Sequence, residues 1–270
     1  MKKLVYIILF GLLLSACEDV IDVDVSNSEP RLVIDALLVR PLNDNGFLNS
    51  NYNIKLSLSS PFFAEEIPPA TGATVFITAE DGTEYAYQDD DNDGDYNPVN
   101  PFSLEFDIDY TLTVIYDGET YTATERLMPT VPIDNLEQGD GVLFGGDETE
   151  VKVTFTDEAT RNDYYLFDLG FDLFLPSEDE FYNGSEFTFS YFYEDMLEGE
   201  EVNIRILGIT EQFYNYMNIL LVQADQDGGG PFQSPAATVR GNIANNTDSD
   251  NFPLGYFSIS EVDDASITIQ

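Results

Sequence analysis

Most of the chain alternates apolar and polar residues with the two-residue period of β-strands. Ile54, Leu56 and Leu58 alternate with polar neighbours, and Val75 and Ile77 repeat that pattern. Side chains at alternate positions point to opposite faces of a sheet, so each of these runs predicts a strand with one buried and one wet face. The pattern therefore predicts a mainly β fold.

The first half of the chain carries strand and turn signals at short intervals. Leu32 to Val39 form an apolar run that is typical of a buried strand. Asp81-Gly82 and Asp117-Gly118 each separate two alternating runs, and such pairs favour tight hairpin turns. Roughly seven short strands in residues 30–130 predict an immunoglobulin-like or transthyretin-like sandwich, although the Cys…Trp…Cys pattern of true immunoglobulin domains is absent.

A change of composition divides the chain. Residues 131–149 are predicted to be a linker, because Pro129 and Pro132 end the first block and Glu137 to Thr149 are rich in glycine and acidic side chains. Residues 150–270 then predict a second, antiparallel β-rich domain. Its expected strands include an alternating run from Val151, one long apolar face from Tyr165 to Leu175, an aromatic run from Phe187 to Tyr193, and two closing segments, Tyr256–Ile259 and Ser266–Gln270.

One segment of the second half has a different period. From about residue 211 to 225, apolar residues such as Phe213, Met217 and Leu221 recur three to four positions apart, which predicts a helix. Thr210 is a suitable N-cap for it. The second domain is therefore expected to be an antiparallel sheet with one helix packed against it.

Composition excludes several classes of function. The chain has 10 basic and 51 acidic residues and a formal charge of −41, so a phosphate backbone would be repelled and no nucleic-acid partner is expected. It has no histidine, no tryptophan and one cysteine, which removes Ser-His-Asp and Cys-His catalysis and histidine zinc sites. We therefore predict that the protein is not an enzyme; a hydrolase that uses paired carboxylates is the remaining alternative.

An acidic loop lies between two predicted strands of the first half. Asp89, Asp91, Asp93 and Asp95 occupy alternate positions, and Gly94 stands at the bend. Calcium prefers about six to eight oxygen ligands, and alternate carboxylates in a tight loop can supply several. The loop lacks the closing glutamate of an EF-hand. It is a candidate calcium site, and a solvated acidic hairpin loop is the alternative.

The beginning of the chain has the layout of a secretory signal. After a basic start, Leu4 to Leu14 contain only apolar residues and one glycine, a run too short to cross a bilayer, for which about 20 residues are needed. Leu14-Ser15-Ala16-Cys17 resembles the lipobox of bacterial lipoproteins, whose cysteine is acylated and becomes the first residue. This implies a signal peptide at 1–16 and lipidation of Cys17; the alternative is an ordinary secretory signal in which Cys17 is incidental.

The tether at residues 17–29 also carries an expectation. Its acidic start resembles the export signal of Bacteroidota surface lipoproteins, which implies a protein on the outer membrane that faces the medium; a solvated linker is the alternative. Tyr214 and Tyr216 lie partly off the apolar stripe of the predicted helix and are candidate contact residues. The strand-spaced aromatic residues are expected to form a core and not a sugar-binding platform.

Several short motifs together resemble one family. They include Arg31-Leu32-Val33-Ile34-Asp35, Gly72-Ala73-Thr74-Val75, Tyr110-Thr111-Leu112-Thr113-Val114, Phe213-Tyr214-Asn215-Tyr216, Gly241-Asn242-Ile243 and Leu254-Gly255-Tyr256-Phe257. The chain is similar in these to a Bacteroidota lipoprotein family, domain of unknown function 4249. Its members are typically encoded beside TonB-dependent outer-membrane transporters. The resemblance implies an accessory partner of such a transporter in nutrient uptake; a free-standing surface binder of glycan or peptide is the alternative.

Overall fold

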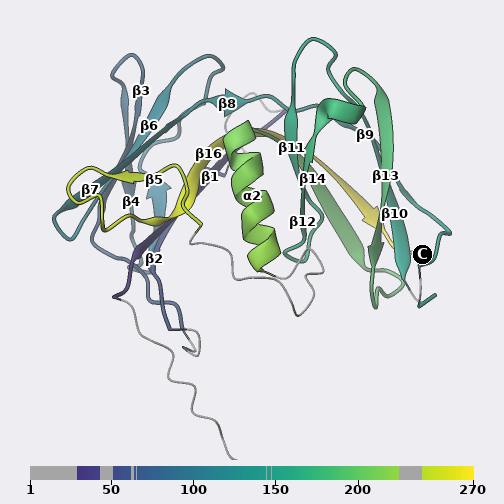
Figure 1. Ribbon diagram of the computed structural model, residues 1–270, viewed down its shortest axis with the longest axis horizontal. Coiled ribbons are helices and arrows are strands. Elements are labelled where there is room, and N and C mark those ends of the chain that lie inside the picture. The colour runs from purple at the N-terminus through teal and green to yellow at the C-terminus, as the bar shows by residue number, and fades with distance from the viewer. Residues whose placement is uncertain are drawn as a thin grey trace, which may run out of the picture.

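The computed structural model describes residues 29–42, 51–61, 64, 66–143, 145–146, 148–224 and 239–270. The predicted signal peptide, Cys17 and nearly all of the tether lie outside this range. The described chain is mainly β with one α-helix, α2 (Glu211–Gln223), so the predicted fold class is confirmed (Figure 1). None of its helices is both long and apolar enough for a membrane span.

Thirteen strands form one large mixed sheet. Its strand order is β12-β11-β14-β16-β1-β2-β5-β4-β3-β6-β7-β15, and β8 pairs with β16. The strands of its first half are β1 (Leu32–Pro41), β2 (Ile54–Leu58), β3 (Thr74–Ala79), β4 (Glu84–Gln88), β5 (Asp95–Pro98), β6 (Tyr110–Tyr116), β7 (Glu119–Glu125) and β8 (Leu127–Met128). The others are β11 (Tyr164–Asp168), β12 (Phe174–Glu178), β14 (Glu201–Ile209), β15 (Ala244–Asn245) and β16 (Leu254–Thr268).

A second sheet has three strands in the order β13-β10-β9. They are β9 (Ile133–Gln138), β10 (Thr149–Thr156) and β13 (Glu186–Tyr193), and a short 3₁₀-helix, η2 (Asp179–Phe181), precedes β13. The predicted linker at 131–149 thus contains β9. The domain boundaries and the immunoglobulin-like or transthyretin-like detail stay predictions.

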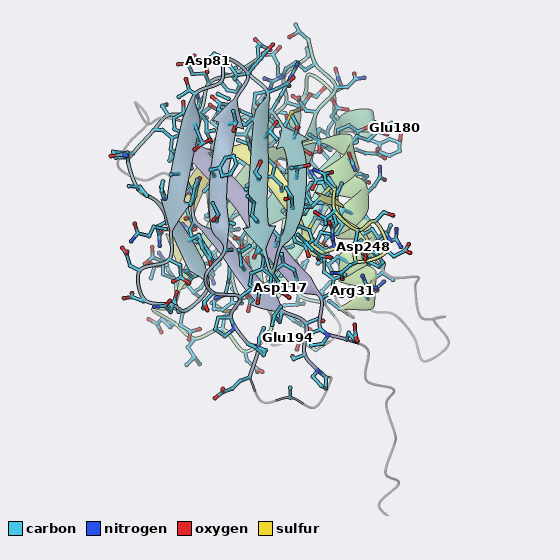
Figure 2. The ribbon with its side chains drawn as sticks, turned by 90° about the vertical axis from the view of Figure 1, so that its left-hand side faces the viewer. Arg31, Asp81, Asp117, Glu180, Glu194 and Asp248 are labelled. Carbon is cyan, nitrogen blue, oxygen red and sulfur yellow. The ribbon has the colours of Figure 1, made fainter. Side chains whose placement is uncertain are left out.

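The two Asp-Gly turns are confirmed. Asp117 and Gly118 have φ angles of 49° and 80° and join β6 to β7, while Gly82 has a φ of 86° in the turn between β3 and β4. Positive φ at both Asp117 and Gly118 matches the hand of a two-residue hairpin turn, whereas in the longer β3–β4 turn only Gly82 of the pair has positive φ. Figure 2 shows Asp81 and Asp117 at opposite ends of this part of the sheet, with Arg31 at the same end as Asp117.

The expectation of one long strand from Tyr165 to Leu175 is wrong. The segment folds into the antiparallel pair β11 and β12. Gly170, Phe171 and Asp172 have φ angles of 76°, 54° and 59°, and the Asp168 carboxylate accepts a hydrogen bond from the Gly170 amide at 2.9 Å. A run of positive φ values reverses the chain, and the apolar alternation on both sides of it hid the turn.

The expectation of two separate closing strands is also wrong, because β16 is one strand of 15 residues. Its first part pairs in parallel with β1, and its second part pairs antiparallel with β14. Polar residues separate the two expected segments, but Glu261 forms an ion pair with Arg40 at 2.6 Å and Asp263 accepts a hydrogen bond from the Ile133 amide at 2.8 Å. These partners keep a polar segment in the sheet.

Three apolar cores hold the fold together. The first lies within the curled sheet of the first half and includes Ile34, Leu56 and Phe257. The second includes Val153 of β10 and Ile206 of β14, which links the three-stranded sheet to the large one. The third lies under α2 and includes Phe213, Met217 and Leu221 of the helix together with Leu166, Leu207 and Tyr256 of the sheet. Figure 1 shows α2 in front of the middle of the molecule, between the two sandwich-like ends.

Candidate functional site

A cavity of about 320 Å³ lies between α2 and the large sheet. Its helix wall and its sheet wall are mostly apolar, and the sheet wall also carries one carboxylate, that of Asp35. The lining residues are Val33, Asp35, Leu37, Leu166, Phe174, Phe213, Tyr216, Met217, Leu220, Gly255, Tyr256 and Ser258.

Two smaller cavities adjoin it. One of about 240 Å³ shares Asp35 and Leu37 with the first and is more polar; it is also lined by Val39, Asn51, Asn53, Lys55 and Arg205. The other, of about 180 Å³, shares Phe174. We call the three together the α2 groove. Concave sites with apolar walls and a few polar groups are the usual form of a ligand site.

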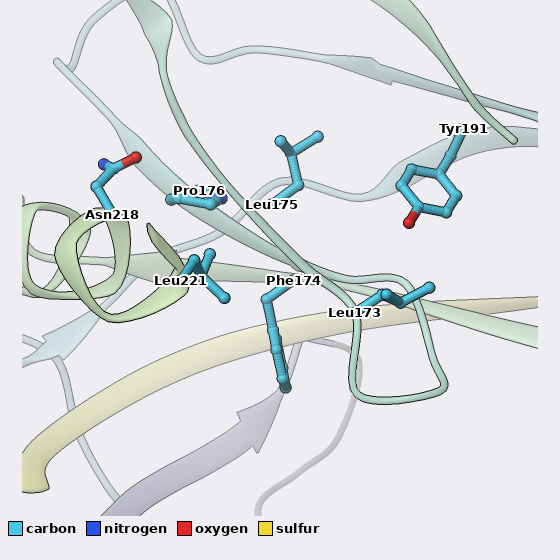
Figure 3. Close-up of a pocket in the computed structure, with 7 residues that line it drawn as sticks. All are labelled: Leu173, Phe174, Leu175, Pro176, Tyr191, Asn218 and Leu221. Atoms are coloured by element: carbon cyan, nitrogen blue, oxygen red, sulfur yellow. The ribbon is translucent and has the colours of Figure 1, made fainter. Parts of the chain in front are cut away.

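Figure 3 shows the smallest of these cavities, at the β12 end of the groove. Asn218 and Leu221 reach into it from α2, and Tyr191 faces it from β13. The Phe174 ring lies between Leu221 and Leu173. Side chains from a helix and from both sheets therefore meet here, and this end of the groove depends on how α2 packs against β12.

The position of α2 follows from its N-terminus. The Thr210 hydroxyl accepts a hydrogen bond from the Phe213 amide at 3.2 Å, so the predicted N-cap is confirmed. The Phe213 ring then lies 4.6 Å from the Tyr256 ring of β16, and the Tyr216 ring lies 4.9 Å from Tyr256. The cap and these aromatic contacts fix the wall of the groove.

The register of the sheet sets the floor of the groove. Asp35 of β1 lies opposite Lys55 of β2 on one side and Tyr256 of β16 on the other. Alternate residues of β1 face opposite sides, so Val33, Asp35 and Leu37 share the face under α2. An apolar groove floor is thereby interrupted by a single negative charge.

The environment of Asp35 is unusual. Asp35 is an exposed residue, although partial desolvation by the surrounding protein raises the pKa of its carboxyl and the charge of Lys55 offsets part of that rise. Among the described residues, none donates a hydrogen bond to its carboxylate. Tyr216 lines the same cavity, and its pKa is raised by burial and also by the charge of Asp35. A perturbed carboxylate in a cleft is a functional-site candidate.

The basic side chains at the polar end of the groove are already paired. Lys55 Nζ lies 3.7 Å from Asp95 Oδ1. Arg205 Nε donates a hydrogen bond to Asp168 Oδ2 at 3.0 Å. Their charges are therefore largely balanced by these carboxylates, and the Asp35 carboxylate is the charge in the groove that lacks such a close partner among the described residues.

The two predicted contact tyrosines are half-buried in the third core. The Tyr214 ring packs 5.3 Å from the Tyr164 ring, outside the cavities of the groove. Tyr216 lines the main cavity. The structure thus brings Tyr216, but not Tyr214, to the groove. A contact role for both stays a prediction.

The acidic loop is organised by its own backbone. Asp89 accepts hydrogen bonds from the amides of Asp93 and Gly94, both at 3.2 Å, and Asp93 accepts one from the Asp95 amide at 3.0 Å. Asp91 is exposed beside them. In the described part of the chain, no group of three or more acidic, histidine or cysteine side chains is arranged to hold a metal ion. Calcium binding stays a prediction, which calcium titration of the wild type and Asp91→Ala would test.

Another set of carboxylates lies near η2. Asp157 and Asp163 are buried, and the single proton of the Tyr165 hydroxyl is shared between them, with oxygen–oxygen distances of 2.6 and 3.1 Å. Asp157 also accepts from the Gly184 amide at 2.8 Å, and burial raises the pKa of Asp163. Two neighbouring buried acids resemble the acid pair of a carboxylate-based hydrolase. Neither of them lines the α2 groove, and both accept hydrogen bonds from groups of the protein itself.

Sequence reasoning overlooked Asp35. The apolar run from Leu32 to Val39 predicts a buried strand, and Asp35 is its one charged residue. A charge inside such a strand needs a compensating environment, because an isolated buried charge is costly. That single interruption was the available signal for the site.

Comparison with known proteins gives one positive result. The family model described as Domain of unknown function (DUF4249) matches residues 18–266. No curated protein matches the chain.

Proposed function

The chain belongs to the family Domain of unknown function (DUF4249), and on that premise we propose that it is an outer-membrane lipoprotein on the cell surface that serves as an accessory, ligand-binding partner of a TonB-dependent transporter. The observation that carries the proposal is the lipobox-like Leu14-Ser15-Ala16-Cys17 in front of a chain that matches one family over nearly its whole length.

Physical reasons support a lipid anchor. A formal charge of −41 disfavours attraction of the protein surface to anionic lipids, so acyl chains at Cys17 would have to supply the membrane affinity. One chain binds weakly and two or more bind stably, at about 0.8 kcal/mol per buried CH₂. Confinement to the membrane raises the effective concentration of the protein near a membrane partner, so even weak contacts suffice.

The α2 groove supports the binding part of the proposal. It joins about 320 Å³ of mostly apolar space to a polar end, and its walls come from α2 and from strands of both halves of the chain. The same groove favours the alternative of a free-standing surface binder of glycan or peptide. A carboxylate-based hydrolase is less well supported, because the buried pair at Asp157 and Asp163 is hydrogen-bonded internally.

Co-purification separates the first two functions. The tagged protein is isolated from detergent-solubilised outer membranes, and its partners are identified by mass spectrometry. We expect a TonB-dependent transporter in near-stoichiometric amount. Recovery of the lipoprotein alone would contradict the transporter association and favour the free-standing binder.

A matched variant tests the anchor. Cys17→Ser removes the sulfur that would be acylated and leaves the described fold unchanged. We expect the wild type in the membrane fraction with an acylated N-terminal peptide, and the variant released from it. An unmodified sulfur in the wild type would refute the lipid anchor.

A further inference from the structure

We propose that the α2 groove binds an organic cation with an apolar body, an amine that carries an alkyl or aryl group, and that the cationic group lies at the Asp35 carboxylate. The inference rests on the proposed function, since it names the class of ligand that the surface protein would hold for its partner.

The negative charge of Asp35 favours a cationic ligand. Its carboxylate lies on an otherwise apolar stretch of floor, and no described residue donates a hydrogen bond to it. The Asp35 side chain is exposed at the groove, so a ligand can reach its carboxylate from solvent. A bound cation would supply a charge partner for it, since Lys55 on the neighbouring strand is already paired with Asp95.

The aromatic walls of the groove also favour a cation. Phe174, Phe213, Tyr216 and Tyr256 place four aromatic rings on the same cavity as Asp35. Aromatic faces attract ammonium and guanidinium groups, and apolar rings also favour the body of the ligand. Leu220 and Met217 extend the apolar wall. A carboxylate beside aromatic rings is complementary to an amine with an apolar substituent.

The charges at the groove disfavour an anionic ligand. Lys55 and Arg205 are the basic side chains at the groove, and each already has a carboxylate partner, Asp95 or Asp168. An anionic ligand would have to compete with these pairs and would face Asp35 itself. The overall charge of −41 also attracts cations and repels anions before contact.

The size of the groove limits the ligand. The main cavity, about 320 Å³, is at the lower end of the range of roughly 300–1,000 Å³ for small-molecule pockets. A ligand with one amine and either a single ring or a short alkyl chain therefore fits this cavity better than a large peptide does.

Isothermal titration calorimetry on the purified full-length lipoprotein in detergent tests the proposal. Three matched probes share a phenyl body and differ in charge: 2-phenylethylamine, 2-phenylethanol and 3-phenylpropanoate. We expect the amine to bind at least tenfold more tightly than the alcohol, and the anion not to bind. Equal affinity for amine and alcohol, or tighter binding of the anion, would overturn the proposal.

Variants separate the charge from the apolar walls. Asp35→Asn should abolish the preference for the amine while leaving the alcohol affinity unchanged, and its urea midpoint should stay near that of the wild type, because the side chain is exposed. A retained tenfold preference in this variant refutes the site. Leu220→Ala should weaken amine and alcohol by the same factor.

A further variant covers the case in which Asp35→Asn does not fold. Tyr216→Leu keeps an apolar wall but removes one ring, so it should lower the amine preference without lowering the alcohol affinity; an unchanged preference would count against the aromatic contribution and the proposal. All probes are measured without a transporter. Absent amine binding beside successful co-purification would therefore refute the ligand class alone, and amine binding without co-purification would refute the transporter association alone.

Discussion

The two faces of β1 differ in how far they are buried. Ile34, Ala36 and Leu38 are 0% exposed and belong to the first core. Val33 and Leu37 on the opposite face are half-buried, and Asp35 between them reaches solvent. One strand thus contributes a closed face to stability and an open face to the α2 groove. The difference shows that a site can be built on a strand whose other face anchors the fold.

Neighbouring leucines offer the sharpest test of this contrast. Leu38→Ala on the closed face should cost about 2–5 kcal/mol of unfolding free energy, since it leaves a cavity in a sealed core. Leu37→Ala on the open face should cost under about 1 kcal/mol, because the groove beside it already contains space. Urea unfolding followed by tyrosine fluorescence measures both. Equal losses would show that the groove is as tightly packed as the core.

A second carboxylate tests whether a raised pKa alone marks a site. Burial raises the pKa of Glu125 from its ordinary value of 4.5 to about 7, although Asn242 Nδ2 donates a hydrogen bond to it at 2.7 Å. The folded state then holds a proton that the unfolded state has lost. Stability should therefore fall as the pH rises from about 4.5 to 7 and change no further above that because of this group.

Glu125→Gln removes this titration and keeps an acceptor for Asn242. We expect the variant to be more stable than the wild type by roughly 1–2 kcal/mol at pH 8, reduced because solvent still reaches the side chain, and equally stable near pH 4. Urea unfolding at several pH values measures the difference. We expect no change in affinity for an amine, in contrast to Asp35→Asn. A difference in stability that does not depend on pH would contradict the assignment.

The smallest expected effect concerns the helix that covers the open face. Thr210→Ala removes the N-cap of α2 and should cost about 1 kcal/mol. Thr210→Ser, which retains the hydroxyl, is the matched control and should stay near the wild type. Thermal unfolding by circular dichroism measures both. If alanine and serine have the same effect, the cap does not hold the groove wall in place.

Local chemistry made part of this structure predictable. The Asp-Gly turns, the alternation in β2 and β10, and α2 with its Thr210 cap each depend on a few adjacent residues, and all are confirmed. The turn at Gly170 was missed because apolar residues continue on both sides of it. The alternation of apolar residues predicts a continuous strand, and the local pattern does not reveal that the glycine within it forms a turn.

The groove was harder to predict because its parts are far apart in sequence. Asp35, Lys55, Arg205 and Tyr256 meet only through the pairing of β1, β2, β14 and β16. Tyr216 was singled out from its position on the helix, whereas its neighbour Asp35 was hidden in an apolar run. No local period encodes which strands become neighbours in a mixed sheet.

The shared strand β16 imposes an order on folding. Val33 near the start of the described residues pairs with Leu254 near their end, so β1 acquires this neighbour only after all the residues between them have been synthesised. Contacts so distant in sequence form slowly, and an unpaired strand edge is prone to join another chain in the meantime. Truncation before β16 would leave β1 with such an edge and the α2 groove without Tyr256, so both halves of the protein depend on this one strand.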